Sequence, residues 1–233
     1  MIVSQTDPAT SATIFSDRSM VTGIVLEILE PARTALLVVD VQNDYCSPSG
    51  ALGEAGLSMT SIDPMVDRVE ELIATARELE IPIVFFRNEH SEETDTPAWR
   101  RRTSHSLSVC KAGTWGADFY RLRPSDRDTE IVKHRYSGFV GTPLEELLHE
   151  WGRNTVVIVG TATNVCVDTT ARHAAILDFD VVVVSDGVAA TDSAAHTASL
   201  DNLERFFGHV IPTSDVRDVW LAGRTQRPNE PLA

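Results

Sequence analysis

Three side chains in this 233-residue sequence could together perform nucleophilic catalysis: Cys166, Asp40 and Lys133. Cys166 follows an apolar run at 155–159 and a turn of small residues, where the next helix is expected to begin. Free amides and the dipole at a helix N-terminus favour a thiolate over a thiol, so this cysteine is a candidate nucleophile. Taken alone, a free cysteine is more often a buried structural residue.

The carboxylate and the ammonium supply what a lone thiol lacks, because an ordinary thiol is only a few per cent ionised at neutral pH. Asp40 could take the thiol proton and return it to a leaving amine, and Lys133 would stabilise both negative charges. Backbone amides before Cys166 could bind an oxyanion. The set indicates hydrolysis of a C–N or similar bond through a thioester or thiocarbamate. Individually, Asp40 could instead cap a loop and Lys133 could be a solvated strand end.

Hydrophobic patterns predict the elements that must position these residues. Buried strands are predicted at 35–41, 81–86, 130–133, 155–159, 181–184 and 210–212, and helices at 64–79, 142–151, 166–177, 193–207 and 214–222. Strands that alternate with helices in this way indicate a parallel sheet covered on both faces. We therefore predict an α/β fold: a single doubly wound, Rossmann-like, three-layer domain around a mostly parallel six-stranded sheet.

The carboxyl ends of the strands are the expected site, because doubly wound sheets bind ligands there. Asp40, Lys133 and Cys166 each end or follow a strand, so one sheet edge could bring them together. In the strand order 3-2-1-4-5-6, however, Lys133 ends two strands from Asp40, about 10 Å away. The lysine is then expected to reach in from the loop beyond the third strand, unless that strand lies elsewhere.

The chain is expected to have one main domain, 34–223, between an N-terminal arm, 1–33, and a polar tail, 224–233. The apolar stretch 21–29 in the arm fits an edge strand, a clasping arm or a short helix. Residues 87–128 have little periodicity, and irregular segments of this kind often form lids and substrate walls. In this segment the basic cluster 100–102 is typical of a solvated surface, but it could also meet an anionic substrate.

Composition excludes several classes of function. The net charge of −14, from 20 basic and 34 acidic residues, argues against nucleic acid and anionic membranes as partners. Neither a membrane-spanning run nor a secretory leader is recognisable. Three unevenly spaced cysteines do not suit a disulfide framework, so a cytoplasmic location is expected. The expected partner is a small-molecule substrate.

No cofactor is predicted. The sequence has neither a G-x-G-x-x-G motif after the first strand nor a phosphate-binding loop. A catalytic metal would need several close histidines and aspartates, whereas the stretch after the second strand has one histidine, His90, which is more easily explained as structural.

Three separated motifs resemble those of the isochorismatase-like cysteine hydrolases. They are Leu-Val-Val-Asp-Val-Gln-Asn at 37–43, Lys-His-Arg-Tyr-Ser-Gly-Phe at 133–139 with Thr-Pro-Leu at 142–144, and Gly-Thr-Ala-Thr-Asn-Val-Cys-Val-Asp-Thr-Thr at 160–170 with Arg172. The resemblance covers roughly 34–208. It implies a catalytic triad of Asp40, Lys133 and Cys166, a cis peptide bond between Thr161 and Ala162, and an oxyanion hole from the amides of Ala162 and Cys166. It also implies a homo-oligomer, a dimer or tetramer, because family members mostly assemble.

Within that family, the segments 133–139, 162–167 and 202–208 look most like those of ureidoacrylate amidohydrolases, which cleave a ureido or carbamoyl C–N bond. The segment 86–90 lacks the Asn-Gly-Trp expected in that subgroup, although Asn88 could still supply an amide. The residues expected to bind substrate are Tyr45, Asn88, Trp115 and Tyr136.

The resemblance therefore implies a metal-independent amidohydrolase that acts on a small ureido or carbamoyl compound. Biuret, triuret and N-carbamoyl amino acids are alternative substrates. Isochorismatases, which often lack the cysteine, and nicotinamidases, which have a histidine-rich metal site, are more distant alternatives. A catalytically silent scaffold of the same fold is the non-enzyme alternative, and the complete Asp, Lys and Cys set argues against it.

Overall fold

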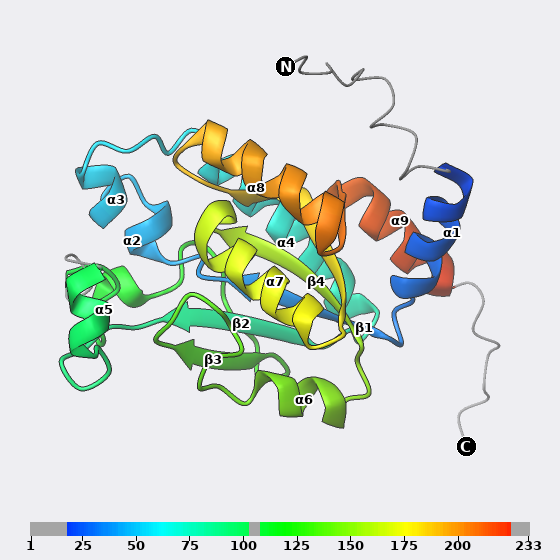
Figure 1. Cartoon of the computed structure of the whole chain (residues 1–233), viewed down its shortest axis with the longest axis horizontal. Coiled ribbons are helices and arrows are strands. Elements are labelled where there is room, and N and C mark those ends of the chain that lie inside the picture. Colours follow the sequence, from blue (N-terminus) through cyan, green and yellow to red (C-terminus); the bar gives the residue numbers. More distant parts are fainter. Residues whose placement is uncertain (1–17, 103–107, 225–233) are drawn as a thin grey trace, which may run out of the picture.

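A computed structural model of the chain describes residues 18–102 and 108–224. Its centre is a six-stranded parallel sheet of order β3-β2-β1-β4-β5-β6 (Figure 1). The strands are β1 (Thr34–Val39), β2 (Ile83–Asn88), β3 (Thr129–Lys133), β4 (Thr155–Thr161), β5 (Asp180–Ala189) and β6 (His209–Ile211). The predicted doubly wound α/β fold is confirmed.

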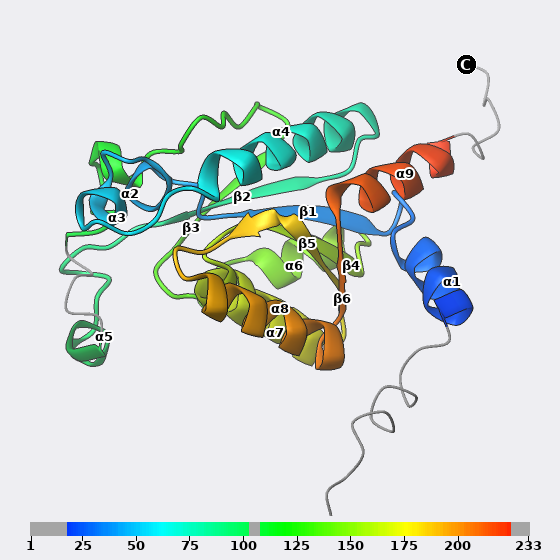
Figure 2. The same cartoon turned by 90° about the horizontal axis from the view of Figure 1, so that it is seen from above.

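Helices cover both faces of the sheet (Figure 2). On one face lie α4 (Ile62–Glu78) and α9 (Thr213–Arg224), and on the other lie α6 (Leu144–Glu150), α7 (Asp168–Ile176) and α8 (Ser193–Phe206). The remaining helix of some length, α1 (Arg18–Ile28), lies beside α9. The short helices α2 (Asn43–Cys46), α3 (Ala51–Glu54) and α5 (Pro97–Arg102) lie toward the carboxyl ends of the strands.

Two apolar layers fix the sheet between these helices. All six residues of β1 are buried. Leu36 and Val38 pack in the layer under α4, whereas Leu37 and Val39 pack in the layer under α6 and α7. Because successive side chains of a strand point to opposite faces, a β-branched run of this kind can serve both layers. The sheet therefore holds the residue after each strand in a defined place.

Several boundaries differ from the sequence-based expectation. The stretch 21–29, which was left open between three forms, lies largely in the helix α1. β5 extends to Ala189, beyond the predicted 181–184, after a register shift against β4 between Ile158 and Gly160. α8 begins at a side-chain cap, since the Asp192 carboxylate accepts hydrogen bonds from the amides of Ala194 and Ala195. Residues 1–17 of the predicted arm and 225–233 of the predicted tail lie outside the described residues.

Candidate active site

The three residues predicted to share a sheet edge meet in one buried cluster. The Lys133 Nζ atom donates a hydrogen bond to Asp40 Oδ2 at 2.7 Å and lies 3.5 Å from the Cys166 sulfur. A third Lys133 contact, at 3.0 Å, is donated to the carbonyl of Arg135. Asp40 and Lys133 are fully buried, and Cys166 is 5% exposed. The ammonium therefore contacts both the carboxylate and the sulfur, and all three groups are largely shielded from water.

Lys133 reaches the cluster from the end of β3 itself. Strand β2 does separate β3 from β1, as the expected strand order required. Lys133 shares a face of β3 with Ile131, which packs in the same layer as Val39. A lysine side chain is a long, flexible four-carbon stem, and here it crosses the end of β2. The expectation that the lysine would come from the loop beyond the third strand was wrong, because the side chain rather than the backbone spans the distance.

The backbone at Asp40 turns sharply where β1 ends. Asp40 has a φ of 49°, in the left-handed region that only a few residue types adopt readily. Its amide donates to the carbonyl of Phe86, and its carbonyl accepts from the Gln42 amide and the Thr161 hydroxyl. These bonds from β2, from the following loop and from β4 hold the carboxylate at the sheet edge.

The Cys166 segment begins at the end of β4, where Gly160 lies against Val39 of β1. Gly160 has a φ of 112°, and a Cβ atom there would lie 2.1 Å from the carbonyl oxygen of Val39, so only glycine fits. The Thr161–Ala162 peptide bond is cis. Cys166 then lies in a π-helical turn, Thr163–Val167, which precedes α7. The predicted helix start at 166 was therefore two residues early, and the cysteine occupies a tighter local structure.

The electrostatics favour a neutral thiol in the resting site. Burial is the main cause that raises the pKa of the Cys166 thiol; the charge of Lys133 opposes this effect and that of Asp40 adds to it. The thiolate expected from the helix N-terminus is thus not the favoured form, because desolvation outweighs the local dipole. The structure replaces that expectation with a thiol beside a base.

The same burial acts on both members of the ion pair. It raises the pKa of the Asp40 carboxyl, which Lys133 opposes, and so makes the carboxylate a stronger base than an exposed aspartate. Burial works to lower the pKa of Lys133, but the charges of Asp40 and Cys166 together raise it. Among the described residues, the Asp40 Oδ1 atom has no hydrogen-bond partner. One carboxylate oxygen is therefore bound by lysine while the other is open to a proton.

Three of the four expected substrate-binding residues surround this cluster. Asn88 lies opposite Lys133 on the neighbouring strand, and its Nδ2 donates to the Tyr45 hydroxyl at 2.8 Å. Burial raises the pKa of the Tyr45 phenol well above its ordinary value, with further contributions from Cys110, Cys166 and Asp40. Tyr136, half-buried, is also within electrostatic range of Cys166 and Lys133.

The fourth, Trp115, lies apart from the others. It belongs to a 3-10 turn, Trp115–Ala117, and its carbonyl accepts a hydrogen bond from the Asn43 side chain. Trp115 is 54% exposed, and it lines a surface hollow together with Asn43 and Arg87. Within the described part of the chain no contact joins Trp115 to the cluster of Asp40, Lys133 and Cys166.

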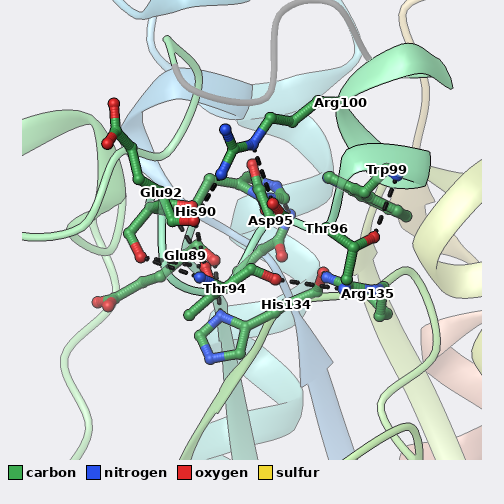
Figure 3. A network of polar contacts seen from close by, with 12 residues as sticks. Glu89, His90, Glu92, Thr94, Asp95, Thr96, Trp99, Arg100, His134 and Arg135 are labelled. Carbon is green, nitrogen blue, oxygen red and sulfur yellow. Dashed lines mark hydrogen bonds and ion pairs between the residues drawn. The ribbon is translucent and has the colours of Figure 1, made fainter.

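Sequence reasoning missed a second buried network beside Asn88 (Figure 3). His90 Nδ1 lies 2.8 Å from Asp95 Oδ1, and His90 Nε2 lies 3.1 Å from Asn88 Nδ2. Because an amide nitrogen can only donate, the Asn88 orientation shown requires His90 to accept at Nε2. The ring of Trp99 stacks on His90 at 5.7 Å and contacts the ring of Tyr136 at 4.8 Å.

Gln42 is another positioning residue that the sequence did not reveal. Its side-chain nitrogen donates to the carbonyls of Asn88 and Ala117, and its side-chain oxygen accepts from the Asn88 amide. It therefore ties the end of β2 to the loop that follows β1. The only sequence signal for Gln42 was its place in the motif at 37–43. Its bond to the carbonyl of Ala117, 75 residues away, could not be read from that motif.

Two further observations, on metal ions and on membranes, concern residues 18–102 and 108–224 alone. No group of three or more histidine, cysteine, aspartate or glutamate side chains is placed there to hold a metal ion. In the same ranges, none of the helices has both the length and the apolar character required to cross a membrane.

Known proteins share both the sequence and the fold. The isochorismatase domain family model matches residues 34–215. The ureidoacrylate amidohydrolase RutB of Methylobacterium radiotolerans is 36% identical over 199 residues, which cover 78% of this chain and 77% of that protein. The RutB protein of Serratia proteamaculans is 34% identical, covering 77% and 79%.

Solved structures of related proteins have the same fold as this chain. A cysteine hydrolase from Pseudomonas syringae pv. phaseolicola superposes with a TM-score of 0.77 at 29% identity, covering 83% of this chain and 94% of that one. An isochorismatase family protein from Desulfovibrio vulgaris gives a TM-score of 0.71 at 28% identity, covering 82% and 98%. With a family model over most of its length and relatives above 30% identity, the chain belongs to the isochorismatase family of hydrolases.

Proposed function

We propose that this chain is a cysteine amidohydrolase that cleaves a C–N bond of a small ureido compound, with ureidoacrylate as the preferred substrate. The observation that carries the proposal is the buried contact of Lys133 with both Asp40 and Cys166. The relatives named ureidoacrylate amidohydrolase support the choice of substrate. We also propose that the reaction is metal-independent, with the nucleophile, the base and the stabilising cation all supplied by side chains of the chain.

The first half of the proposed reaction forms a covalent intermediate. Asp40 takes the proton of the Cys166 thiol through its open oxygen, and the sulfur attacks the ureido carbonyl carbon. The negative charge that develops on the carbonyl oxygen is bound by the amides of Ala162 and Cys166. The C–N bond then breaks, the leaving amine takes the proton from Asp40, and the carbamoyl group stays on sulfur as a thiocarbamate.

The second half returns the enzyme to its starting state. Asp40 takes a proton from a water molecule, and the oxygen of that water attacks the thiocarbamate carbon. The C–S bond breaks, the thiolate takes the proton back, and a carbamate is released. Lys133 remains charged throughout and stabilises whichever partner, carboxylate or thiolate, carries the negative charge. One water is consumed for each C–N bond broken.

Tyr45, Asn88 and Tyr136 are the residues proposed to bind the substrate. The Asn88 Oδ1 atom is buried and has no hydrogen-bond partner among the described residues. A buried amide oxygen without a partner costs free energy, and an N–H group of the ureido substrate would satisfy it. This feature favours a substrate with hydrogen-bond donors beside the carbonyl.

The substrate is tested by steady-state kinetics of the purified chain with 3-ureidoacrylate, biuret, triuret, an N-carbamoyl amino acid and nicotinamide. We expect kcat/KM for 3-ureidoacrylate to exceed each of the others by about tenfold or more, since buried polar groups left unpaired penalise the wrong substrate. Ammonia release and loss of the ureido compound report the reaction. Preference for nicotinamide, or turnover of none of the five, would contradict the proposed function.

The pH dependence follows from the role of Asp40 as base. Only the carboxylate can take the thiol proton, so kcat/KM should fall on the acid side as Asp40 is protonated. Because the pKa of Asp40 is raised, this fall should lie above the ordinary value of 3.8. Lys133, with its pKa raised above 10.5, stays charged over the working range. A profile that rises only in alkaline solution would indicate a thiolate that forms without the base.

A further inference from the structure

The three arginines at 100–102 have different surroundings, and Arg102 lies at the ring of Trp99, which contacts Tyr136. The side chain of Arg100 donates to the carbonyls of Asp95 and Glu92, at 2.9 Å and 2.6 Å, and so is engaged in holding the loop after β2 (Figure 3). Arg101 is exposed on α5. The guanidinium carbon of Arg102 lies 5.3 Å from the centre of the Trp99 ring.

A second guanidinium joins Arg102 over the same aromatic ring. The guanidinium carbon of Arg135 lies 4.9 Å from the Trp99 ring centre, and its nitrogens donate to the backbone carbonyls of His134 and Thr94. Within the described ranges, neither Arg102 nor Arg135 forms an ion pair with a carboxylate. In a chain of net charge −14, these two guanidinium groups at one ring form a positively charged site.

Trp99 and Tyr136 connect this positive site to the nucleophile. The two rings lie 4.8 Å apart, and Trp99 is almost fully buried. Burial raises the pKa of the Tyr136 phenol; the charge of Cys166 adds to this effect, whereas those of Arg102 and Lys133 oppose it. Arg102 and Cys166 therefore both lie within electrostatic range of one phenol.

We propose that Arg102, with Arg135 at the same Trp99 ring, binds a carboxylate group of the substrate while Cys166 attacks the ureido carbonyl at the other end. The inference rests on the proposed function and names the substrate class more narrowly as anionic ureido compounds. A guanidinium binds a carboxylate through two parallel hydrogen bonds, and stacking on Trp99 holds it ready for that contact. Neutral ureido compounds such as biuret gain nothing from this site.

The kinetic test compares an anionic substrate with a neutral one. In Arg102→Gln, we expect KM for 3-ureidoacrylate to rise about tenfold or more with kcat changed far less, because the lost contact binds ground state and transition state alike. KM for biuret should stay within about twofold. Arg101→Gln is the matched control on the same helix and should change neither value, and Arg102→Lys should recover part of the loss. An equal rise in KM for both substrates would overturn the inference.

An alkylation test separates this inference from the proposed function. Iodoacetate and iodoacetamide react with the same sulfur and differ in charge, so their rate ratio at Cys166, followed by peptide mass mapping, reports the local positive potential. At low ionic strength, Arg102→Gln should lower the iodoacetate-to-iodoacetamide ratio by about threefold or more, and Arg101→Gln should not. If the wild-type chain hydrolyses neither ureido compound, the proposed function fails. The alkylation ratio then decides by itself whether Arg102 forms a carboxylate-binding site. An unchanged ratio in Arg102→Gln would show that no carboxylate-binding site lies beside Cys166.

Discussion

Replacing Cys166 by alanine is expected to abolish hydrolysis of the confirmed substrate while the protein stays folded. The thiol is the only group of the cluster that can form the covalent intermediate, so its loss should lower kcat by about 10⁴-fold or more. Cys166→Ser should be nearly as inactive, because a hydroxyl is a far weaker acid than a thiol. Ammonia release under saturating substrate measures the effect, and circular dichroism checks the fold.

Cys110→Ala provides the matched control for that experiment. Cys110 is also a buried free thiol whose pKa is raised by burial, but among the described residues its sulfur bonds to the Gly116 carbonyl and not to Lys133. Its loss should leave kcat within a few-fold of wild type. Alkylation at Cys166 near neutral pH should be stoichiometric in the wild type and suppressed in Asp40→Asn, which lacks the base. Full activity of a folded Cys166→Ala variant would refute the mechanism, and a thiol that reacts only after denaturation would favour the silent scaffold.

The sheet could be predicted well because its signal is local. Runs such as 35–41 and 155–159 are rich in β-branched residues, and only a strand buried on both faces explains such runs. Each predicted strand appears in the structure, and the order 3-2-1-4-5-6 places β1 and β4 side by side at the centre. Asp40 and Cys166 follow these neighbours, so their meeting follows from topology alone.

The protonation state of Cys166 and the reach of the Lys133 side chain could not be predicted from the hydrophobic pattern. The expectation of a Cys166 thiolate used only the helix that follows, whereas burial of the thiol in the folded chain raises its pKa. Likewise, the contact of Lys133 with Asp40 depends on how far a side chain extends across β2. Both are properties of packing between segments that are about a hundred residues apart in sequence, and periodicity within one segment does not report them.

The irregular segment 87–128 accounts for most of what was missed. Where no periodicity exists, the sequence does not show which side chains face inward, and Trp99 and Trp115 illustrate the consequence. Both are tryptophans in non-strand segments, yet Trp99 is 3% exposed beside Tyr136 and Trp115 is 54% exposed.

The homo-oligomer and the cytoplasmic location stay predictions.

Replacing Lys133 by methionine is expected to impair stability and catalysis together. Met approximates the length of the lysine stem but leaves the fully buried Asp40 without its cation. Removing one partner of a buried ion pair typically costs about 3–5 kcal/mol, because the other charge remains desolvated. Asp40 would also take up a proton more readily, so less of it could serve as a base. We expect kcat/KM to fall about 10³-fold and the denaturation midpoint in urea to fall clearly.

The double variant Asp40→Asn, Lys133→Met separates these two effects. With both charges removed, no buried ion is left unpaired, so much of the stability lost in Lys133→Met should return. Activity should not return, because an asparagine cannot take the thiol proton. Urea unfolding and kcat/KM measured on the wild type, both single variants and the double variant complete the cycle. If the double variant were no more stable than Lys133→Met, the ion pair would not be the cause of the instability. If it regained activity, Asp40 would not be the base.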